Sequence, residues 1–177
     1  MNLAPGVSFD EGKHEYWYKG KQLSGITGLV SKKLGLKYSN AFVREHAEEG
    51  IHIHKAVQKW IQTGNSDSVH PGVQWITTFM AFSRTRFYSE ILVSDFMQYA
   101  SAVDIIETVN DEFFLYDIKK GRFNREYVTW QLSVYKYFIE KFTGFQVAKL
   151  FCLAIKDKEI YPIFPKKFED VEKLLYG

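Results

Sequence analysis

Three charged side chains near the middle of the chain have the types and the spacing of a metal site. Asp104 stands in one apolar stretch, and Asp117 and Lys119 stand in the next. If Asn110 and Asp111 form a two-residue hairpin turn, Asp104 falls directly opposite Asp117. Alternate residues of a strand share a face, so Lys119 lies on the same face as both carboxylates.

Two carboxylates that face each other in a sheet repel, and their burial beside apolar residues costs desolvation. One lysine leaves a surplus negative charge, which a hard divalent cation such as Mg²⁺ or Mn²⁺ would neutralise. Such an ion activates water and stabilises charge on a phosphate, and Lys119 would orient that water or neutralise the transition state. The pattern therefore predicts a site that cleaves phosphodiester bonds. The alternative is an exposed hairpin in which Asp117 makes an ordinary salt bridge with Lys119 or Lys120.

The order of these residues resembles the PD-(D/E)XK nuclease superfamily, in particular its RecB-type and phage-exonuclease-like branches. In those proteins an aspartate ends one strand and Asp/Glu-x-Lys follows on the next, as Asp104 precedes Asp117 and Lys119 here. The RecB-type branch adds a helix with a glutamine and a tyrosine four residues later, which Gln131 and Tyr135 match. Together the motifs cover nearly the whole chain.

Further matches lie upstream. The same branch has a glycine followed four residues later by histidine, as in Gly50 and His54, and some members carry a glutamate on the preceding strand, where this chain has Glu90. Residues 14–16, 20–21 and 24–27 also resemble the opening of small phage nucleases. Two positions depart from the family pattern: Ser101 stands where glycine is usual, and Lys120 where threonine is common.

The resemblance implies roles for the matched residues. The implied metal ligands are His54, Asp104 and Asp117, with Glu90 holding a second metal or a metal-bound water. The implied catalytic set is Asp104, Asp117, Lys119, Gln131 and Tyr135, in which Gln131 contacts the site or the adjacent DNA phosphate. His46 and His52 are the competing histidines, and Tyr135 has an alternative role in the apolar face of its helix.

A basic segment follows the predicted catalytic strand. Lys120, Arg122 and Arg125 join that strand to the next helix, and a basic loop beside a metal site suits contacts to phosphate. A solvated basic loop is the alternative interpretation. The net charge of the chain is only +2, so binding to nucleic acid requires such a local patch.

Composition limits the other classes of protein. With 177 residues, 46% of them hydrophobic, the chain is predicted to form one domain over residues 1–177. Cys152 is the single cysteine, which excludes an internal disulfide and a four-cysteine iron–sulfur cluster. Neither a signal peptide nor a membrane-spanning stretch is visible, so we expect a cytoplasmic protein, or one in a host cytoplasm if phage-encoded.

Periodicity predicts an α+β fold, a mixed central sheet flanked by helices with an N-terminal β-hairpin. The family resemblance implies a restriction-endonuclease-like core. The expected strands are residues 14–18, 21–23, 88–94, 98–108, 112–119, 146–155 and 159–164. The expected helices are residues 24–34, 40–61, 71–86, 124–142 and 169–176.

The leading hypothesis is a Mg²⁺- or Mn²⁺-dependent deoxyribonuclease, in particular an exonuclease that serves recombination of phage or mobile-element DNA. DNA is the expected partner, together with further copies of the chain or a recombination protein. A second hypothesis is a catalytically silent binding module that regulates a host complex. A third keeps the catalysis and takes RNA as the substrate.

Overall fold

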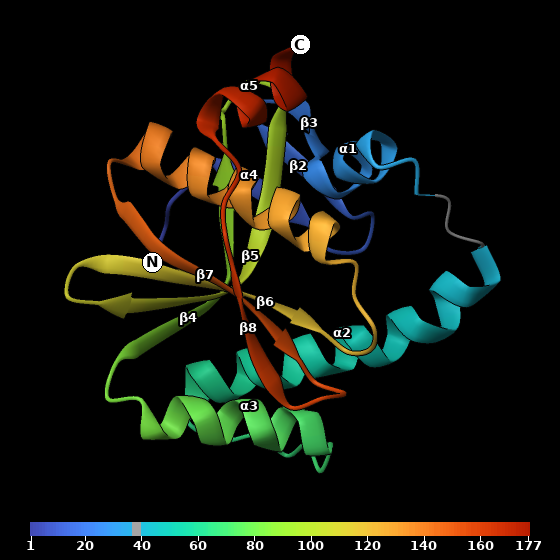
Figure 1. The fold of residues 1–177 in the computed structure, drawn as a ribbon, viewed down its shortest axis with the longest axis vertical. Helices are drawn as coiled ribbons and strands as arrows, with labels where there is room; N and C mark the ends of the chain where they lie inside the picture. The colour runs from blue at the N-terminus through green and yellow to red at the C-terminus, as the bar shows by residue number, and fades with distance from the viewer. Residues whose placement is uncertain (37–39) are drawn as a thin grey trace.

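The computed structural model describes the backbone of residues 1–36 and 40–177 and the side chains of residues 1–36 and 49–177. Within these residues the chain forms a mixed sheet of eight strands with five helices (Figure 1). The predicted α+β class, the flanking helices and the N-terminal hairpin are confirmed. No helix of the described part is long and apolar enough to cross a membrane.

The N-terminal strands form an antiparallel meander of β1 (Val7–Asp10), β2 (Glu15–Tyr18) and β3 (Lys21–Gly25). The turn between β2 and β3 has positive φ at Lys19 and Gly20, as a two-residue hairpin requires. The β2–β3 hairpin was predicted, and β1 is an additional strand at the edge of the described sheet, where it pairs with β2.

Three helices follow, α1 (Ile26–Lys33), α2 (Asn40–Thr63) and α3 (Pro71–Phe82). The third was predicted to continue to Arg86, and that boundary is wrong because the chain turns into β4 (Arg86–Ser94). Two hydroxyls of the connecting residues, on Ser83 and Thr85, donate hydrogen bonds to the buried carboxylate of Glu107 at 2.8 and 2.6 Å. These bonds hold the connection in a non-helical conformation.

The remaining strands are β5 (Tyr99–Val109), β6 (Glu112–Lys119), β7 (Gln146–Ala154) and β8 (Glu159–Ile163). The predicted turn joins β5 to β6, with φ of 49° at Asn110 and 66° at Asp111. Ile106 pairs with Leu115, which is the register expected from a two-residue turn. Continued along the strands, this register sets Asp104 opposite Asp117.

Strand β5 keeps one partner along one edge and changes partner along the opposite edge. The first edge pairs with β4 from Ala100 to Thr108. On the edge away from β4, Ala100 pairs with Gly25 of β3, and pairing to β6 begins only at Ile105. Among the described residues, 101–104 therefore have no strand partner on that side, and β3 and β6 diverge there. Asp104 stands at the end of this opening.

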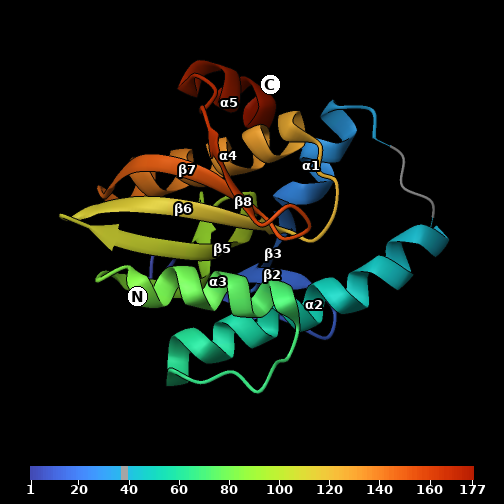
Figure 2. The ribbon, with the colours of Figure 1, turned by 60° about the horizontal axis from the view of Figure 1, so that its bottom comes forward.

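The sheet lies between two helical layers, with α4 (Arg125–Thr143) and α5 (Phe168–Tyr176) on one face and α2 and α3 on the other (Figure 2). Each layer has its own apolar core. One core joins the sheet to α1, α4 and α5, and the other joins it to α2 and α3. These two cores fix α2 and α4 against opposite faces of the strands that carry the predicted site.

Candidate metal centre

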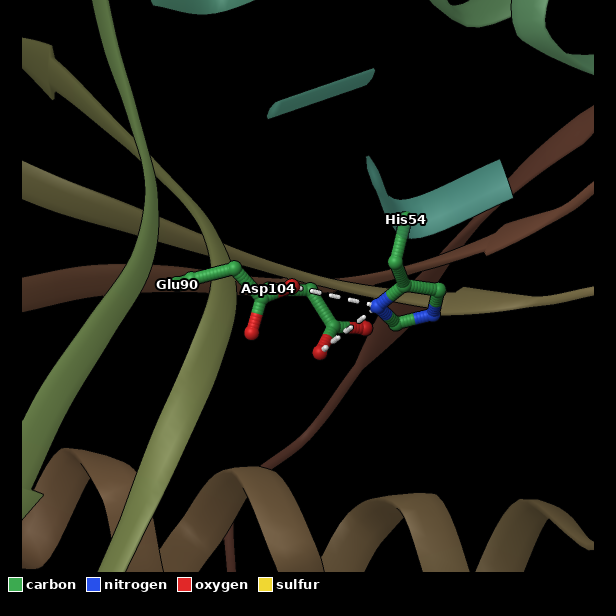
Figure 3. Close-up of side chains that lie close together, drawn as sticks. All are labelled: His54, Glu90 and Asp104. Carbon is green, nitrogen blue, oxygen red and sulfur yellow. Dashed lines mark hydrogen bonds and ion pairs between the residues drawn. The ribbon is translucent and has the colours of Figure 1, made fainter. Parts of the chain in front are cut away.

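Three potential metal ligands converge from three elements, His54 on α2, Glu90 on β4 and Asp104 on β5 (Figure 3). One ligand atom of each lies within 4.8 Å of the others. His54 Nδ1 is 3.2 Å from Glu90 Oε1 and 3.7 Å from Asp104 Oδ1. One imidazole and two carboxylates at this spacing form a donor set that fits a divalent cation such as Mn²⁺.

His54 reaches the cluster because α2 buries Ile53 and Val57 in the core against the sheet. The adjacent His54 is then directed to the margin of that core, where it is partly exposed. Asp104 raises the pKa of His54 to about 9, with Glu90 adding to this effect and burial opposing it. Of the competing histidines, His52 is exposed outside the cluster, and the side chain of His46 lies outside the described residues.

The side chain of Asp104 is anchored to the neighbouring strand β6. Its Oδ2 accepts a hydrogen bond of 2.7 Å from the backbone N–H of Ile118, while its Oδ1 faces His54. Burial raises the pKa of Asp104, against the charge of His54, which lowers it. One carboxylate oxygen is thus anchored to β6, and the other is directed to the cluster.

Glu90 has an unusual backbone for a strand residue, with φ of +52°. Ser89 pairs with Ile105 and Ile91 pairs with Val103, so Glu90 lies opposite Asp104, where the ladder is interrupted. A left-handed conformation costs an L-residue about 1–2 kcal/mol. Such strain concentrates at functional sites, where surrounding contacts maintain it.

Asp117 lies beside this cluster but not within it. Its side chain is 1% exposed, and both of its oxygens are 2.9 Å from Lys119 Nζ. Only Oδ1 accepts a hydrogen bond; Oδ2 receives none from the described residues, and its contact with the ammonium is one of charge alone. Burial raises the pKa of Asp117 to about 6, and Lys119 opposes this shift. Asp117, the predicted ligand that lies outside the cluster, is therefore a buried carboxylate with one oxygen that accepts no hydrogen bond from the described residues.

A chain of hydrogen bonds leads from Lys119 across to α4. Lys119 Nζ donates to Gln131 Oε1 at 3.4 Å, and Gln131 Nε2 donates to the hydroxyl of Tyr135 at 2.8 Å. That hydroxyl lies 3.2 Å from Ser101 Oγ on β5. Gln131 therefore contacts Lys119, and Tyr135 contacts Gln131; that the two contribute to catalysis stays a prediction.

The predicted basic loop is largely engaged within the protein. Lys120 makes an ion pair with Glu49 of α2, and Glu49 also contacts His70 at 3.2 Å. Arg125 donates a hydrogen bond of 2.8 Å to the carbonyl of Pro162. Arg122 is exposed. The structure therefore brings Lys120 and Arg125 into contacts within the protein, while Arg122 and Arg125 are both exposed.

A cleft of about 600 Å³ opens above the three potential ligands. Its floor includes Glu90 and Asp104, and residues of α2 and α4 form two of its walls. A further wall comes from the N-terminal strands, where Phe9, His14 and Tyr16 line the cleft. His14 and Tyr16 belong to the strand predicted at residues 14–18, whereas sequence reasoning missed Phe9 because β1 was not predicted. The alternation of Val7 and Phe9 with polar neighbours is the signal that would have revealed that strand.

Ser101 was noted in the sequence only as a departure from the family pattern. In the structure its hydroxyl meets Tyr135 and the side chain lines the cleft. Burial raises the pKa of Tyr16, while hydrogen bonds with Ser101 and the Ala102 backbone lower it. Ser101 therefore connects the N-terminal hairpin to α4, a role that only the folded arrangement reveals.

A comparison with known protein families found no matching family model, and a comparison with curated proteins found no match. The function is therefore inferred from the geometry of the site.

Proposed function

We propose that this protein is a divalent-metal-dependent nuclease of the PD-(D/E)XK type that hydrolyses phosphodiester bonds in DNA. The observation that carries the proposal is the convergence of ligand atoms from His54, Glu90 and Asp104 within 4.8 Å, next to the buried pair of Asp117 and Lys119. His54 and the carboxylates would hold Mg²⁺ or Mn²⁺, and the oxygen of Asp117 without a hydrogen bond is available to it. When bound, the ion supplies an activated water and neutralises charge on the phosphate.

The residues of the chain divide the remaining tasks. Burial lowers the pKa of Lys119, but Asp117 and Asp104 more than offset this, so the ammonium stays protonated. Lys119 therefore acts as a fixed positive charge at the edge of the cluster rather than as a base. Gln131 and Tyr135 restrict the position of that charge through their hydrogen bonds.

DNA as the substrate follows from the resemblance in motif order. The silent-module hypothesis requires that the chain keep a clustered ligand set, a paired lysine and a strained glutamate without using them. Strain and unsatisfied buried oxygens are costly, and their concentration at one place favours a working site.

The test is a cleavage assay on end-labelled linear DNA and on circular DNA, with Mn²⁺, with Mg²⁺ and with EDTA. We expect metal-dependent degradation that Asp104→Asn and Lys119→Ala abolish. The matched controls are Asp157→Asn and Lys156→Ala, which change the same charges on exposed residues of the β7–β8 turn. Equal activity in Asp104→Asn and Asp157→Asn would refute the site, and binding of Mn²⁺ without cleavage would favour the silent module.

A further inference from the structure

The cleft has two chemically different ends. The metal ligands lie on its floor, and the rings of Phe9, His14 and Tyr16 line the wall made by β1 and β2. Phe9 and Tyr16 are cross-strand partners and their rings stack, with centroids 4.7 Å apart and planes at 28°. His14 stands edge-on to Phe9 at 5.1 Å. An aromatic surface therefore continues directly from the proposed metal centre.

Two of these rings are accessible from the cleft. His14 is exposed and Phe9 is half-buried, whereas Tyr16 is buried behind them. His14 has φ of +56°, a left-handed conformation that turns the chain between the two strands. Core packing explains Tyr16 and the buried part of Phe9, but it does not explain why His14 and the remainder of Phe9 are exposed beside the ligand cluster.

The dimensions of the cleft limit what enters it. A volume of about 600 Å³ lies in the range of sites for small organic groups, which matches one or two nucleotides. One side is closed by an ion pair of 2.6 Å between Lys55 of α2 and Glu11 of the β1–β2 turn. Both residues line the cleft, so the pair joins two of its walls. A volume of this size holds one or two nucleotides and not an intact double helix.

We infer that Phe9 and His14 form a stacking site for an unpaired base, so that the preferred substrate is single-stranded DNA. This inference rests on the proposed nuclease function and deepens it. A base on these rings would leave its phosphate directed to the metal ligands on the floor. Stacking suits this role because every base has an aromatic face, so the site binds single strands without regard to sequence.

The test measures binding apart from cleavage. Fluorescence anisotropy of a labelled oligothymidylate, compared with a blunt duplex of equal length, is recorded with Ca²⁺ as the divalent ion. The ring variants are Phe9→Leu, which keeps an apolar side chain, and His14→Asn, which tolerates positive φ. Phe9→Tyr restores an aromatic ring. Trp17→Ala is the matched control, since Trp17 is an exposed aromatic residue of β2 that does not line the cleft.

We expect single strands to bind more tightly than the duplex, and each ring variant to weaken single-strand binding by about fivefold or more. Phe9→Tyr and Trp17→Ala should bind as the unaltered protein does. Equal affinity for duplex and single strand, or ring variants that bind normally, would overturn the inference. If the ring variants weaken binding but the protein shows no metal-dependent cleavage, the stacking site is supported and the nuclease function is refuted. If the protein cleaves DNA but the ring variants bind normally, the nuclease function is supported and the stacking site is refuted.

Discussion

Glu90 lies directly opposite Asp104 in the β4–β5 ladder, and its backbone is left-handed although it stands inside a strand. This conformation interrupts the pairing at the point where Glu90 and His54 approach each other to 3.2 Å. The sheet is thus locally strained where the ligand cluster is formed, and the strain can be measured.

We predict that Glu90→Gly leaves the free energy of unfolding of the metal-free protein unchanged or raises it by up to about 1.5 kcal/mol. Removal of the left-handed strain gains about 1–2 kcal/mol, and the extra freedom of glycine in the unfolded chain costs about 0.5–1. Urea denaturation measures the change. The control is Ser89→Gly, which has no strain to relieve and should lose about 0.5–1 kcal/mol. A loss in Glu90→Gly as large as in Ser89→Gly would show that Glu90 is unstrained.

Asp117→Asn should stabilise the metal-free protein at high pH. The pKa of Asp117 is raised to about 6 from an ordinary 3.8, so the folded state favours the protonated form. The protonated carboxyl of Asp117 therefore contributes fully to stability below pH 3.8, and this contribution is lost as the pH rises through about 6. Asparagine does not ionise, so the advantage of the variant should grow from pH 5 to pH 8, to about 1 kcal/mol or more. Urea unfolding at both pH values tests this, and a constant difference would contradict it. Asp157→Asn is the exposed control.

Binding of Mn²⁺ should release a proton from His54. Asp104 raises the pKa of His54 to about 9, so the imidazole is protonated at neutral pH and must lose its proton to bind an ion. Affinity should therefore rise with pH until about 9, by up to about tenfold per unit. Calorimetry in two buffers of different ionisation enthalpy measures the release. His54→Asn should abolish the release at neutral pH, and an unaltered protein that binds Mn²⁺ without releasing a proton would contradict the assignment.

Protonation of His54 also affects the stability of the metal-free protein: a rise in pH that favours Mn²⁺ binding lowers this stability. Because the folded pKa of His54 lies above the ordinary 6.5, its contribution to stability is complete below pH 6.5 and is lost as the pH rises through about 9. The metal-free protein should therefore be less stable at pH 9 than at pH 6.5, and saturating Mn²⁺ should reverse much of that loss. Thermal unfolding at both pH values, with and without the ion, measures this pattern.

Tyr135→Phe should slow cleavage by about 10–100-fold while the affinity for Mn²⁺ stays unchanged. The phenol of Tyr135 accepts the hydrogen bond that orients Gln131, and Gln131 accepts from Lys119. The matched control is Tyr137→Phe on the same helix, because the hydroxyl of Tyr137 bonds to Glu172 and not to the site. Equal rates in the two variants would show that the chain of hydrogen bonds does not position Lys119.

Local rules predicted the part of the site that lies within one hairpin. Asn110 and Asp111 accept positive φ, a two-residue turn fixes the register, and the register places Asp104 opposite Asp117. No such rule predicts the partner of Lys120, because Glu49 is brought to it by the packing of α2 against the sheet. The sequence alone left Lys120 available for DNA, and the tertiary fold engages it.

The division between ligands and supporting residues was also beyond the sequence. A register shows that Asp104 and Asp117 are close, and the spacing already offered a salt bridge between Asp117 and Lys119, but nothing local shows that the backbone of Ile118 anchors Asp104. Likewise the end of α3 at Phe82 depends on the carboxylate of Glu107, which lies in a distant strand. Each of these outcomes follows from contacts between residues far apart in the chain, where local propensity carries no information.

The change of partner along β5 has a consequence for folding. The pairings of β5 with β4 and β6 join neighbours in the chain, whereas the contact of Gly25 with Ala100 closes a long loop. Contacts of this kind form slowly because loop closure costs entropy before any contact compensates it. We expect the strand meander that carries Glu90, Asp104 and Asp117 to assemble first and the N-terminal hairpin to dock afterwards. A newly made chain would then form the carboxylate cluster on β4–β6 before the aromatic residues of the N-terminal strands dock beside it.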